Sequence, residues 1–299
     1  MTKQNSAYLY ALIVILFWST MSSAFKITLR YIDFRLMLLF ACASSVLILF
    51  LILFFQRKLN QLQNLTIKQI GSSAIMGFLN PFAYYLILFK AYDLLAAQIA
   101  GTLNYCWPVV LVILSIPLLK QKISYKSILA LLVSFFGIII ISTEGHILSL
   151  EIKNLYGVML AVGSAIFWAL YWIFNMKDKR DEVAKLFLNF CFGLAYILIM
   201  IFIGDDFHIP KFEGIIGSVY IGFFEMGITY VLWLKALSLS INTAKVSNLV
   251  YLSPFIALLI IHLTVGEDIL ISTFIGLFFI VSGIVIQKYI DPLKASDNK

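Results

Sequence analysis

Long apolar segments alternate with short polar breaks along the whole chain. A helix needs about 20 predominantly apolar residues to cross the hydrocarbon core of a bilayer. The pattern predicts ten transmembrane helices, at 7–25, 36–55, 70–89, 97–119, 127–143, 156–175, 186–204, 214–234, 246–265 and 270–288. These segments are continuously apolar and do not alternate, which argues against a membrane β-barrel. We therefore expect an all-α integral membrane protein.

The composition supports this interpretation. Hydrophobic residues make up 62% of the 299 residues and charged residues only 12%, whereas a soluble domain has about 45–50% apolar and 25% charged residues. Cys42, Cys106 and Cys191 lie inside apolar segments and show no metal-ligand spacing, so we interpret them as buried apolar side chains. We expect neither a metal site nor a cofactor.

The first apolar segment also has features of a signal peptide, because Ser22-Ser23-Ala24 resembles a cleavage site. Its basic amino-terminal region is only Lys3, and the segment resembles a later one that cannot be a signal. We therefore interpret it as the first transmembrane helix.

The basic residues predict the orientation of the chain. If the amino terminus is cytoplasmic, only six of the 22 Lys and Arg residues lie on the opposite side: Lys26, Arg30, Arg35, Lys90, Lys153 and Lys211. Cytoplasmic loops carry the excess of Lys and Arg, so we expect both termini to be cytoplasmic in a multi-pass protein of the inner membrane. The first outer loop, with three basic residues, is the exception. This distribution also explains the net charge of +7 without a nucleic-acid partner.

The chain repeats itself after five predicted helices. The matching positions are Phe17-Trp18 with Phe167-Trp168, Asn80 with Glu225, Tyr85 with Tyr230, Tyr105 with Tyr251 and Pro108 with Pro254. We predict two homologous units, 1–146 and 147–299. Since five is odd, the second unit enters the membrane inverted, and inverted repeats commonly build transporters whose substrate site lies near the midplane.

Glu225 is the most informative single residue, because it lies in the middle of an apolar segment. A carboxylate at that depth costs about 2.5–3.5 kcal/mol on the more lenient insertion scale, so it must face a cavity or a partner. One interpretation is a counter-ion for a substrate amine or a site of proton coupling. The alternative is a protonated structural carboxyl group bonded to a neighbouring helix.

Aromatic and amide side chains form the rest of the candidate binding site. Trp168, Tyr171 and Trp172 share one helical face, and aromatic rings near a carboxylate suit a cationic or amphiphilic ligand. Interfacial anchoring and helix packing are the alternatives for such residues. The candidate substrate-binding residues are Trp18, Asn80, Tyr85, Asn104, Tyr105, Trp107, Trp168, Tyr171, Trp172, Glu225, Tyr230 and Tyr251, with Glu225 also the candidate coupling residue.

No catalytic motif is present: the chain has no HExxH, no GxSxG and no P-loop. We therefore do not expect an enzyme, and transport driven by ATP hydrolysis within this chain is excluded. Movement of a solute must be coupled to a proton or a counter-substrate, or be facilitated flow.

The repeats and motifs resemble the drug/metabolite transporter superfamily, in its ten-helix EamA-like branch, over roughly residues 7–288. More narrowly, 16–21, 104–108 and 167–171 resemble the corresponding stretches of bacterial aromatic amino acid exporters. The resemblance implies a central cavity between four-helix sets from each half, lined by helices one, three, four, six, eight and nine, with helices five and ten at the periphery. Glu225 has no counterpart in the exporter pattern and favours ligands with a positive group.

These observations predict a secondary transporter that moves small organic metabolites by alternating access. An exporter of aromatic or amphiphilic amino acids is our first reading. A transporter or exchanger of a cationic metabolite, such as an S-adenosylmethionine-like compound or a quaternary amine, is the second. A membrane-embedded enzyme acting on lipids is a remote third.

Overall fold

The computed structural model describes residues 2–120, 124–148, 152–204, 209–240, 246 and 249–290, and every regular element within these ranges is helical. Four of the basic residues assigned above to the cytoplasmic side, Lys122, Lys245, Lys294 and Lys299, lie outside the described residues.

Nine helical spans in the described part of the chain are long and apolar enough to cross a membrane, and a shorter apolar one covers Leu249–Val265. The spans are α1 (Lys3–Thr28), α2 (Phe34–Phe55), α3-η2-α4 (Ile67–Leu94), α5 and α6 (Ala97–Leu119), α7 (Tyr125–Ser142), α8 (Leu155–Asn175), α9 (Glu182–Gly204), α10-η3-α11 (Phe212–Leu239), η4 with α13 (Leu249–Val265) and α14 (Ile271–Ile290). A short turn, η1 (Leu59–Leu62), follows α2. The predicted all-α membrane fold is confirmed, with boundaries within a few residues of those expected.

Local sequence signals explain where several helices begin and end. The side chain of Thr66 caps α3 and its backbone N–H bonds to Gln69, which is a complete capping box. Lys120 after α6 and Gly266 after α13 both adopt left-handed conformations, as residues that end helices often do. These two stops occupy equivalent positions in the two repeats.

Two spans are interrupted in mid-membrane by π-helical turns. These turns are η2 (Phe78–Ala83) between α3 and α4, and η3 (Gly222–Gly227) between α10 and α11. Asn80 within η2 leaves helical geometry altogether, with φ −151° and ψ 119°. Broken helices expose backbone groups that a neighbouring helix or a cavity must satisfy, so these equivalent breaks mark sites of special interest in both repeats.

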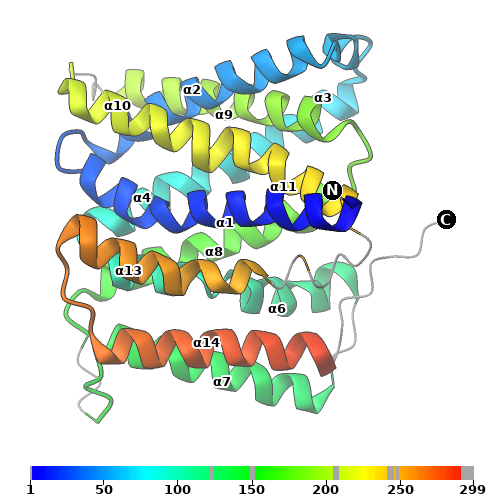
Figure 1. Cartoon of the computed structure of the whole chain (residues 1–299). Helices are drawn as coiled ribbons and strands as arrows, with labels where there is room; N and C mark the ends of the chain where they lie inside the picture. Colours follow the sequence, from blue (N-terminus) through cyan, green and yellow to red (C-terminus); the bar gives the residue numbers. More distant parts are fainter. Residues whose placement is uncertain are drawn as a thin grey trace.

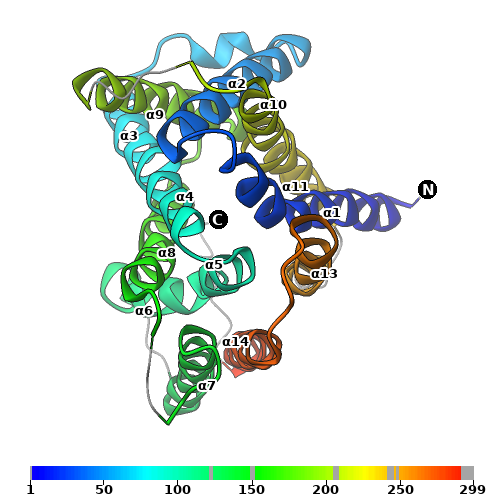
Figure 2. The ribbon, with the colours of Figure 1, turned by 90° about the vertical axis from the view of Figure 1, so that its left-hand side faces the viewer.

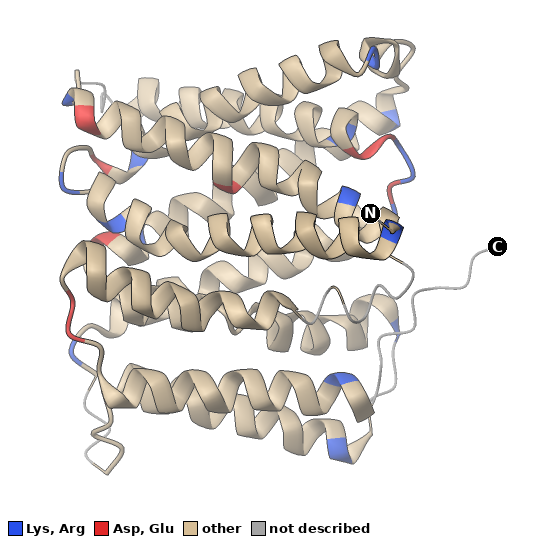
Figure 3. Ribbon diagram, viewed as in Figure 1, with Lys and Arg blue, Asp and Glu red and all other residues tan. Residues whose placement is uncertain are grey.

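The helices run side by side, with the start of α1 and the end of α14 at the same end of the bundle (Figure 1). We call this the basic end and the opposite one the far end. Lys, Arg, Asp and Glu gather at these two ends (Figure 3).

Viewed from the far end, two rows of helices face each other (Figure 2). We call α3, α4, α5, α6 and α8 the first wall, and α1, α10, α11 and α13 the second wall. Within them α8 packs on α4, α5 and α6, while α1 packs on α10, α11 and α13. The α2–α9 pair closes one side between the walls, and the α7–α14 pair closes the other.

Each wall therefore combines helices of both repeats. This corrects the expected arrangement of one four-helix set from each half. The physical reason is that the first helix of each repeat, α1 or α8, packs on the third and fourth membrane spans of the other repeat.

The α7–α14 pair packs closely through glycines. A side-chain carbon added to Gly137 would collide with the carbonyl oxygen of Gly276, and one added to Gly283 would collide with Ser134 on α7. The Ser134 hydroxyl donates to the Ile280 carbonyl, 3.1 Å away. Small residues of this kind permit close helix approach in lipid.

Candidate functional site

A cavity of ≈ 1180 Å³ lies between the two walls. Pockets for drug-sized ligands are commonly about 300–1,000 Å³, so a small metabolite fits with room to spare. The lining extends along the bundle from Ser22, Phe25, Tyr92 and Gly101 to Leu119, Met176, Lys177 and Lys288, which lie where α6, α8 and α14 end. The cavity therefore reaches the basic end of the bundle.

All five tryptophans of the chain line this one cavity: Trp18, Trp107, Trp168, Trp172 and Trp233. In membrane proteins tryptophan ordinarily gathers at the two interfaces with water, where it anchors helices. Its concentration around an internal space is therefore informative, and it provides an aromatic surface for a ligand.

Trp168 lies at the centre of the aromatic network. Its ring centroid is 4.7 Å from that of Tyr84, 6.4 Å from that of Trp107 and 5.8 Å from that of Trp172. It also lies 6.1 Å from the ring of Tyr230 in the second wall. Trp168 therefore contacts rings from both walls, in the range where aromatic pairs attract one another.

Glu225 projects from the broken segment η3 and lines the cavity. The Tyr85 hydroxyl donates a hydrogen bond to its carboxylate over 3.1 Å. Tyr85 belongs to the first wall and Glu225 lies between α10 and α11 of the second, so this bond joins the walls deep in the membrane. The Thr229 hydroxyl donates to the Phe224 and Glu225 carbonyls and satisfies acceptors that the helix break frees.

Other polar contacts lie along the cavity, some within the first wall and one between the walls. Asn104 donates to the Tyr84 hydroxyl over 3.0 Å and accepts from Ser164 over 3.2 Å, which fixes the orientation of its amide. The Tyr105 hydroxyl lies 3.0 Å from that of Ser253 on α13 and forms a second bond between the walls.

Lysine side chains lie at the basic end of the cavity. Lys177 follows α8, and Lys288 lies in the last turn of α14 with its ammonium group 5.7 Å from the centre of the Tyr251 ring. Together with Ile284 and Gln287, Lys288 makes α14 part of the cavity lining. The resemblance implied a peripheral tenth helix, whereas α14 also lines the basic end of the cavity.

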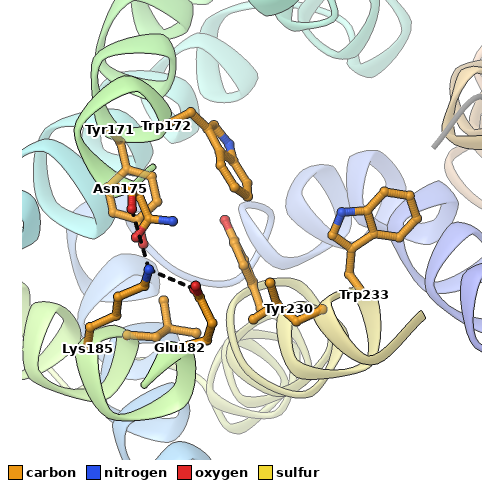
Figure 4. Close-up of a pocket in the computed structure, with 9 residues that line it drawn as sticks. Tyr171, Trp172, Asn175, Glu182, Lys185, Tyr230 and Trp233 are labelled. Atoms are coloured by element: carbon orange, nitrogen blue, oxygen red, sulfur yellow. Dashed lines mark hydrogen bonds and ion pairs between the residues drawn. The ribbon is translucent and has the colours of Figure 1, made fainter. Parts of the chain in front are cut away.

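A small side pocket of ≈ 20 Å³ adjoins the cavity and shares Trp172, Tyr230 and Trp233 with it. In Figure 4 the Tyr230 ring extends from α11 toward Trp172 on α8. The Lys185 ammonium group pairs with the Glu182 carboxylate at 2.8 Å and donates to the Asp178 carbonyl over 3.1 Å. This volume holds about one water molecule, too little for an organic solute.

The loop between α8 and α9 is anchored by further ion pairs. Arg180 pairs with Asp178 at 2.6 Å and donates to Ser73 on α3, and Lys58 pairs with Asp181 at 2.6 Å. Burial alone would raise the pKa of Asp178, but its bonds to Arg180 outweigh burial and hold that pKa below its usual value. Likewise, burial would raise the pKa of Asp181, and its bonds to Lys58 and to backbone N–H groups lower it.

Nine of the twelve candidate residues line the cavity: Trp18, Asn104, Tyr105, Trp107, Trp168, Trp172, Glu225, Tyr230 and Tyr251. Tyr85 is buried behind the surface and contacts two residues of the lining, Glu225 through its hydroxyl and Tyr84 through its ring. Tyr171 lines the side pocket instead. Asn80 is buried within η2, which packs on α8 and α9.

Several lining residues were not singled out in the sequence, among them Tyr84, Tyr92, Trp233, Lys177 and Lys288. A signal existed for three of them. Tyr84, Leu88 and Tyr92 recur every four residues, and Trp233 follows Tyr230 by three, so each set shares one helical face. Lys177 and Lys288 carry no such pattern. Among the described residues, no three His, Cys, Asp or Glu side chains gather in a way that could hold a metal ion.

Comparison with known proteins identifies the family. The sequence model of the EamA-like transporter family matches residues 5–143 and 155–287. YoaV of Bacillus subtilis (strain 168), described as an uncharacterized transporter, is 24% identical over 247 residues, which cover 81% of this chain and 82% of that protein. An uncharacterized transporter of Archaeoglobus fulgidus is 22% identical over 282 residues, covering 92% and 95%.

A shorter match, to an uncharacterized transporter of Clostridium kluyveri, is 27% identical over 191 residues and covers 61% of this chain and 60% of that protein. One solved crystal structure shares the fold, with a TM-score of 0.65 at 19% identity, and covers 96% of this chain and 97% of that one. The family model spans most of the sequence, and this chain belongs to the EamA-like transporter family.

Proposed function

We propose that this transporter moves small organic solutes that combine an apolar, preferably aromatic, part with an amino group, and that aromatic amino acids are its main substrates. The observation that carries this proposal is the lining of the central cavity, where all five tryptophans surround a space containing one carboxylate, Glu225. Glu225 is the only acidic side chain among the described residues of that lining.

The lining suggests how such a solute is bound. An aromatic side chain stacks among Trp168, Tyr84 and Trp107, and the Tyr84 and Trp107 rings each lie within contact distance of Trp168. Lys177 and Lys288 attract its carboxylate as it enters from the basic end, and its ammonium group then meets the carboxylate of Glu225. Binding energy thus comes from ring contacts, and selectivity from the charges.

Glu225 also suggests how the solute is coupled to a gradient. Its carboxylate bonds Tyr85 of the opposite wall, so a proton or a substrate ammonium that binds this carboxylate competes with a contact between the walls. Alternating access then follows from motion of one wall against the other. Exchange against a second solute uses the same step.

Orientation completes the proposal. With both termini in the cytoplasm of a cell bounded by an inner membrane, the basic end faces inward, as the distribution of Lys and Arg favours. The cavity then loads from the cytoplasm, which suits an exporter.

A cationic metabolite, such as an S-adenosylmethionine-like compound or a quaternary amine, is the second candidate. The described lining near η3 holds the acidic Glu225 and no basic side chain that could pair with a substrate carboxylate, since Lys177 and Lys288 lie at the basic end. This charge distribution favours a solute that is mainly cationic. A quaternary amine or a sulfonium compound would bind through cation–π contacts with the tryptophans.

The test is a thermal-shift screen of the purified protein, since a ligand of the folded state raises its apparent stability by mass action. We expect aromatic amino acids to stabilise the protein more than aliphatic ones, and Trp168→Ala to lose that response while Trp168→Phe keeps most of it. Transport of the best ligand is then measured in proteoliposomes. Stabilisation only by quaternary amines would favour the second candidate, and stabilisation by neither class would overturn both.

A further inference from the structure

Polar contacts join the walls at the far end of the bundle, and they centre on the corner between α4 and α5. Glu267, in the connection between α13 and α14, accepts hydrogen bonds from the backbone N–H groups of Ala97 at 2.7 Å and Gln98 at 3.1 Å. These are the first residues of α5, and Ala96 before them provides no side-chain cap. Glu267 therefore caps a helix of the other wall.

Gln98 completes a reciprocal contact with the same connection. Its side-chain amide donates to the Asp268 carbonyl and accepts from the Leu270 N–H, both over 2.9 Å. Gln98 is buried, so both polar ends of its amide are satisfied inside the protein only by the opposite wall.

The other side of the corner is held by a positive charge. Lys26 at the end of α1 donates to the carbonyls of Tyr92 at 2.8 Å and Leu95 at 2.7 Å, where α4 ends. A cation at a helix carboxyl end and an anion at a helix amino end both interact favourably with the helix dipoles. Second-wall charges thus match both helix ends of this first-wall corner. We call Lys26, Gln98 and Glu267 the corner clamp.

The sequence of the repeat does not carry the charges of the clamp at the corresponding positions, two of which, 121 and 244, lie outside the described residues. In the register that pairs Trp18 with Trp168 and Tyr105 with Tyr251, the mates of Lys26, Gln98 and Glu267 are Met176, Ala244 and Gln121. Both charges are missing from that set. The cavity lining reaches Met176, whereas the corner clamp crosses between the walls at the far end.

We propose that the corner clamp is the far-end gate of this transporter, and that it keeps the cavity open to the basic end when no solute is bound. Opening to the far end requires Glu267 to leave the amino end of α5 and Lys26 to leave the carboxyl end of α4. This inference rests on the proposed alternating access, but it makes no assumption about the solute.

The test measures access to the cavity from the far end without any substrate. Met21→Cys places a thiol in the lining, and a membrane-impermeant maleimide is added to vesicles on the far-end side. The parent without Met21→Cys gives the background from Cys42, Cys106 and Cys191. Labelling of Met21→Cys should be slow, and much faster when the reagent is added at the basic end.

Weakening the clamp should raise far-end labelling. Glu267→Gln, which removes the charge, is expected to raise the rate by about two- to fivefold, and Glu267→Ala with Gln98→Ala by about tenfold or more. Glu213→Gln is the control, because Glu213 is an exposed acid in the first turn of α10 at the same end. Lys26→Gln serves as a second variant if the Glu267 variants fail to fold.

Two results would overturn the proposal. One is far-end labelling in folded clamp variants that matches the parent, and the other is a parent that is labelled equally fast from both ends. If the clamp variants are labelled faster from the far end but the protein binds neither aromatic amino acids nor cationic metabolites, the gate is supported and the proposed substrates are wrong.

Discussion

The two broken helices occupy equivalent places in the two repeats, yet they point their polar side chains in different directions. In η3, Glu225 faces the cavity and accepts a bond from Tyr85 of the opposite wall. In η2, Asn80 is buried where η2 packs on α8 and α9. The backbone break is therefore shared by the repeats, whereas exposure to the cavity belongs to one of them.

The position of the backbone break differs between the two segments. In η2 it falls on Asn80 itself, whereas in η3 it falls on Gly227, two residues after Glu225. A side-chain carbon added to Gly77 would collide with the backbone of Asn189, and one added to Gly193 would meet the Pro81 ring at 2.5 Å. The α3–η2 span is thus pressed against α9, as Gly222 of η3 is against Ala41 and Ser44 of α2, and the Asn80 amide is buried in protein rather than exposed to the cavity. We conclude that the scaffold is nearly symmetric and that the binding chemistry is concentrated on the η3 side.

The largest expected effect is that of Glu225→Gln. Removing one partner of a buried charge pair costs about 2–5 kcal/mol, so the affinity for an amine-bearing solute should fall by about 30-fold or more. Thermal shifts measured across a ligand titration test this prediction, with Glu213→Gln as the matched control. Unchanged affinity in folded Glu225→Gln protein would remove the carboxylate from the binding site.

Asn80→Ala tests the other break. It removes a buried amide for which no hydrogen-bond partner is found among the described residues, so the cost is the void left in a tightly packed segment. We expect the free energy of unfolding to fall by about 1–2 kcal/mol. Ligand affinity should fall much less than in Glu225→Gln. Thermal unfolding and ligand titration of the same preparation separate the two effects, and the reverse ranking of affinity loss would contradict the asymmetry.

Tyr85→Phe tests the link between the walls. It deletes only the hydroxyl that bonds Glu225, and one such bond is worth about 0.5–1.5 kcal/mol. We expect a change in ligand affinity of about two- to twelvefold and an altered pH dependence of transport in proteoliposomes. Tyr196→Phe on α9, whose ring packs against Phe78 and Phe82, is a control outside the cavity lining. Identical pH profiles in Tyr85→Phe and the parent would show that Tyr85 does not tune Glu225.

The smallest expected effect is that of Asp178→Asn, in the loop between α8 and α9. The pKa values of Asp178 and Asp181 are lowered in the folded protein, so their stabilising contribution is present above the unfolded pKa of about 3.9 and is lost as pH falls through the lower folded values. Asp178→Asn should cost less than about 1 kcal/mol at pH 7, and its melting temperature should converge on that of the parent at about pH 3. A difference in melting temperature between Asp178→Asn and the parent that stays constant from pH 7 to about pH 3 would show that the charge of Asp178 does not stabilise the fold.

Much of the fold followed from the sequence because hydrophobic segments and polar breaks are local signals. The ten spans and the pairing of Asn80 with Glu225 were all readable in this way. Cavity lining was predictable where residues recur on one helical face, as Trp168 and Trp172 do.

Other features depended on contacts between distant residues. Asn80 and Glu225 are equivalent positions in the sequence repeat, and the different backbone geometry around each becomes visible only in the structure. The interleaved walls were missed because no local pattern shows that α1 packs on α11 and α13. The corner clamp joins Lys26 and Glu267 to backbone groups, which carry no sequence signal at all.

The interleaved walls also constrain how the protein is made. Because α1 completes its wall only with α10, α11 and α13, the amino-terminal repeat leaves the ribosome before its main packing partners exist. In the finished protein the hydroxyl of Ser19 bonds that of Ser253 at 3.2 Å. This contact cannot form until α13 has been synthesised and inserted. Assembly is thus completed late in translation, and the two repeats expressed as separate chains must interleave with each other to form either wall.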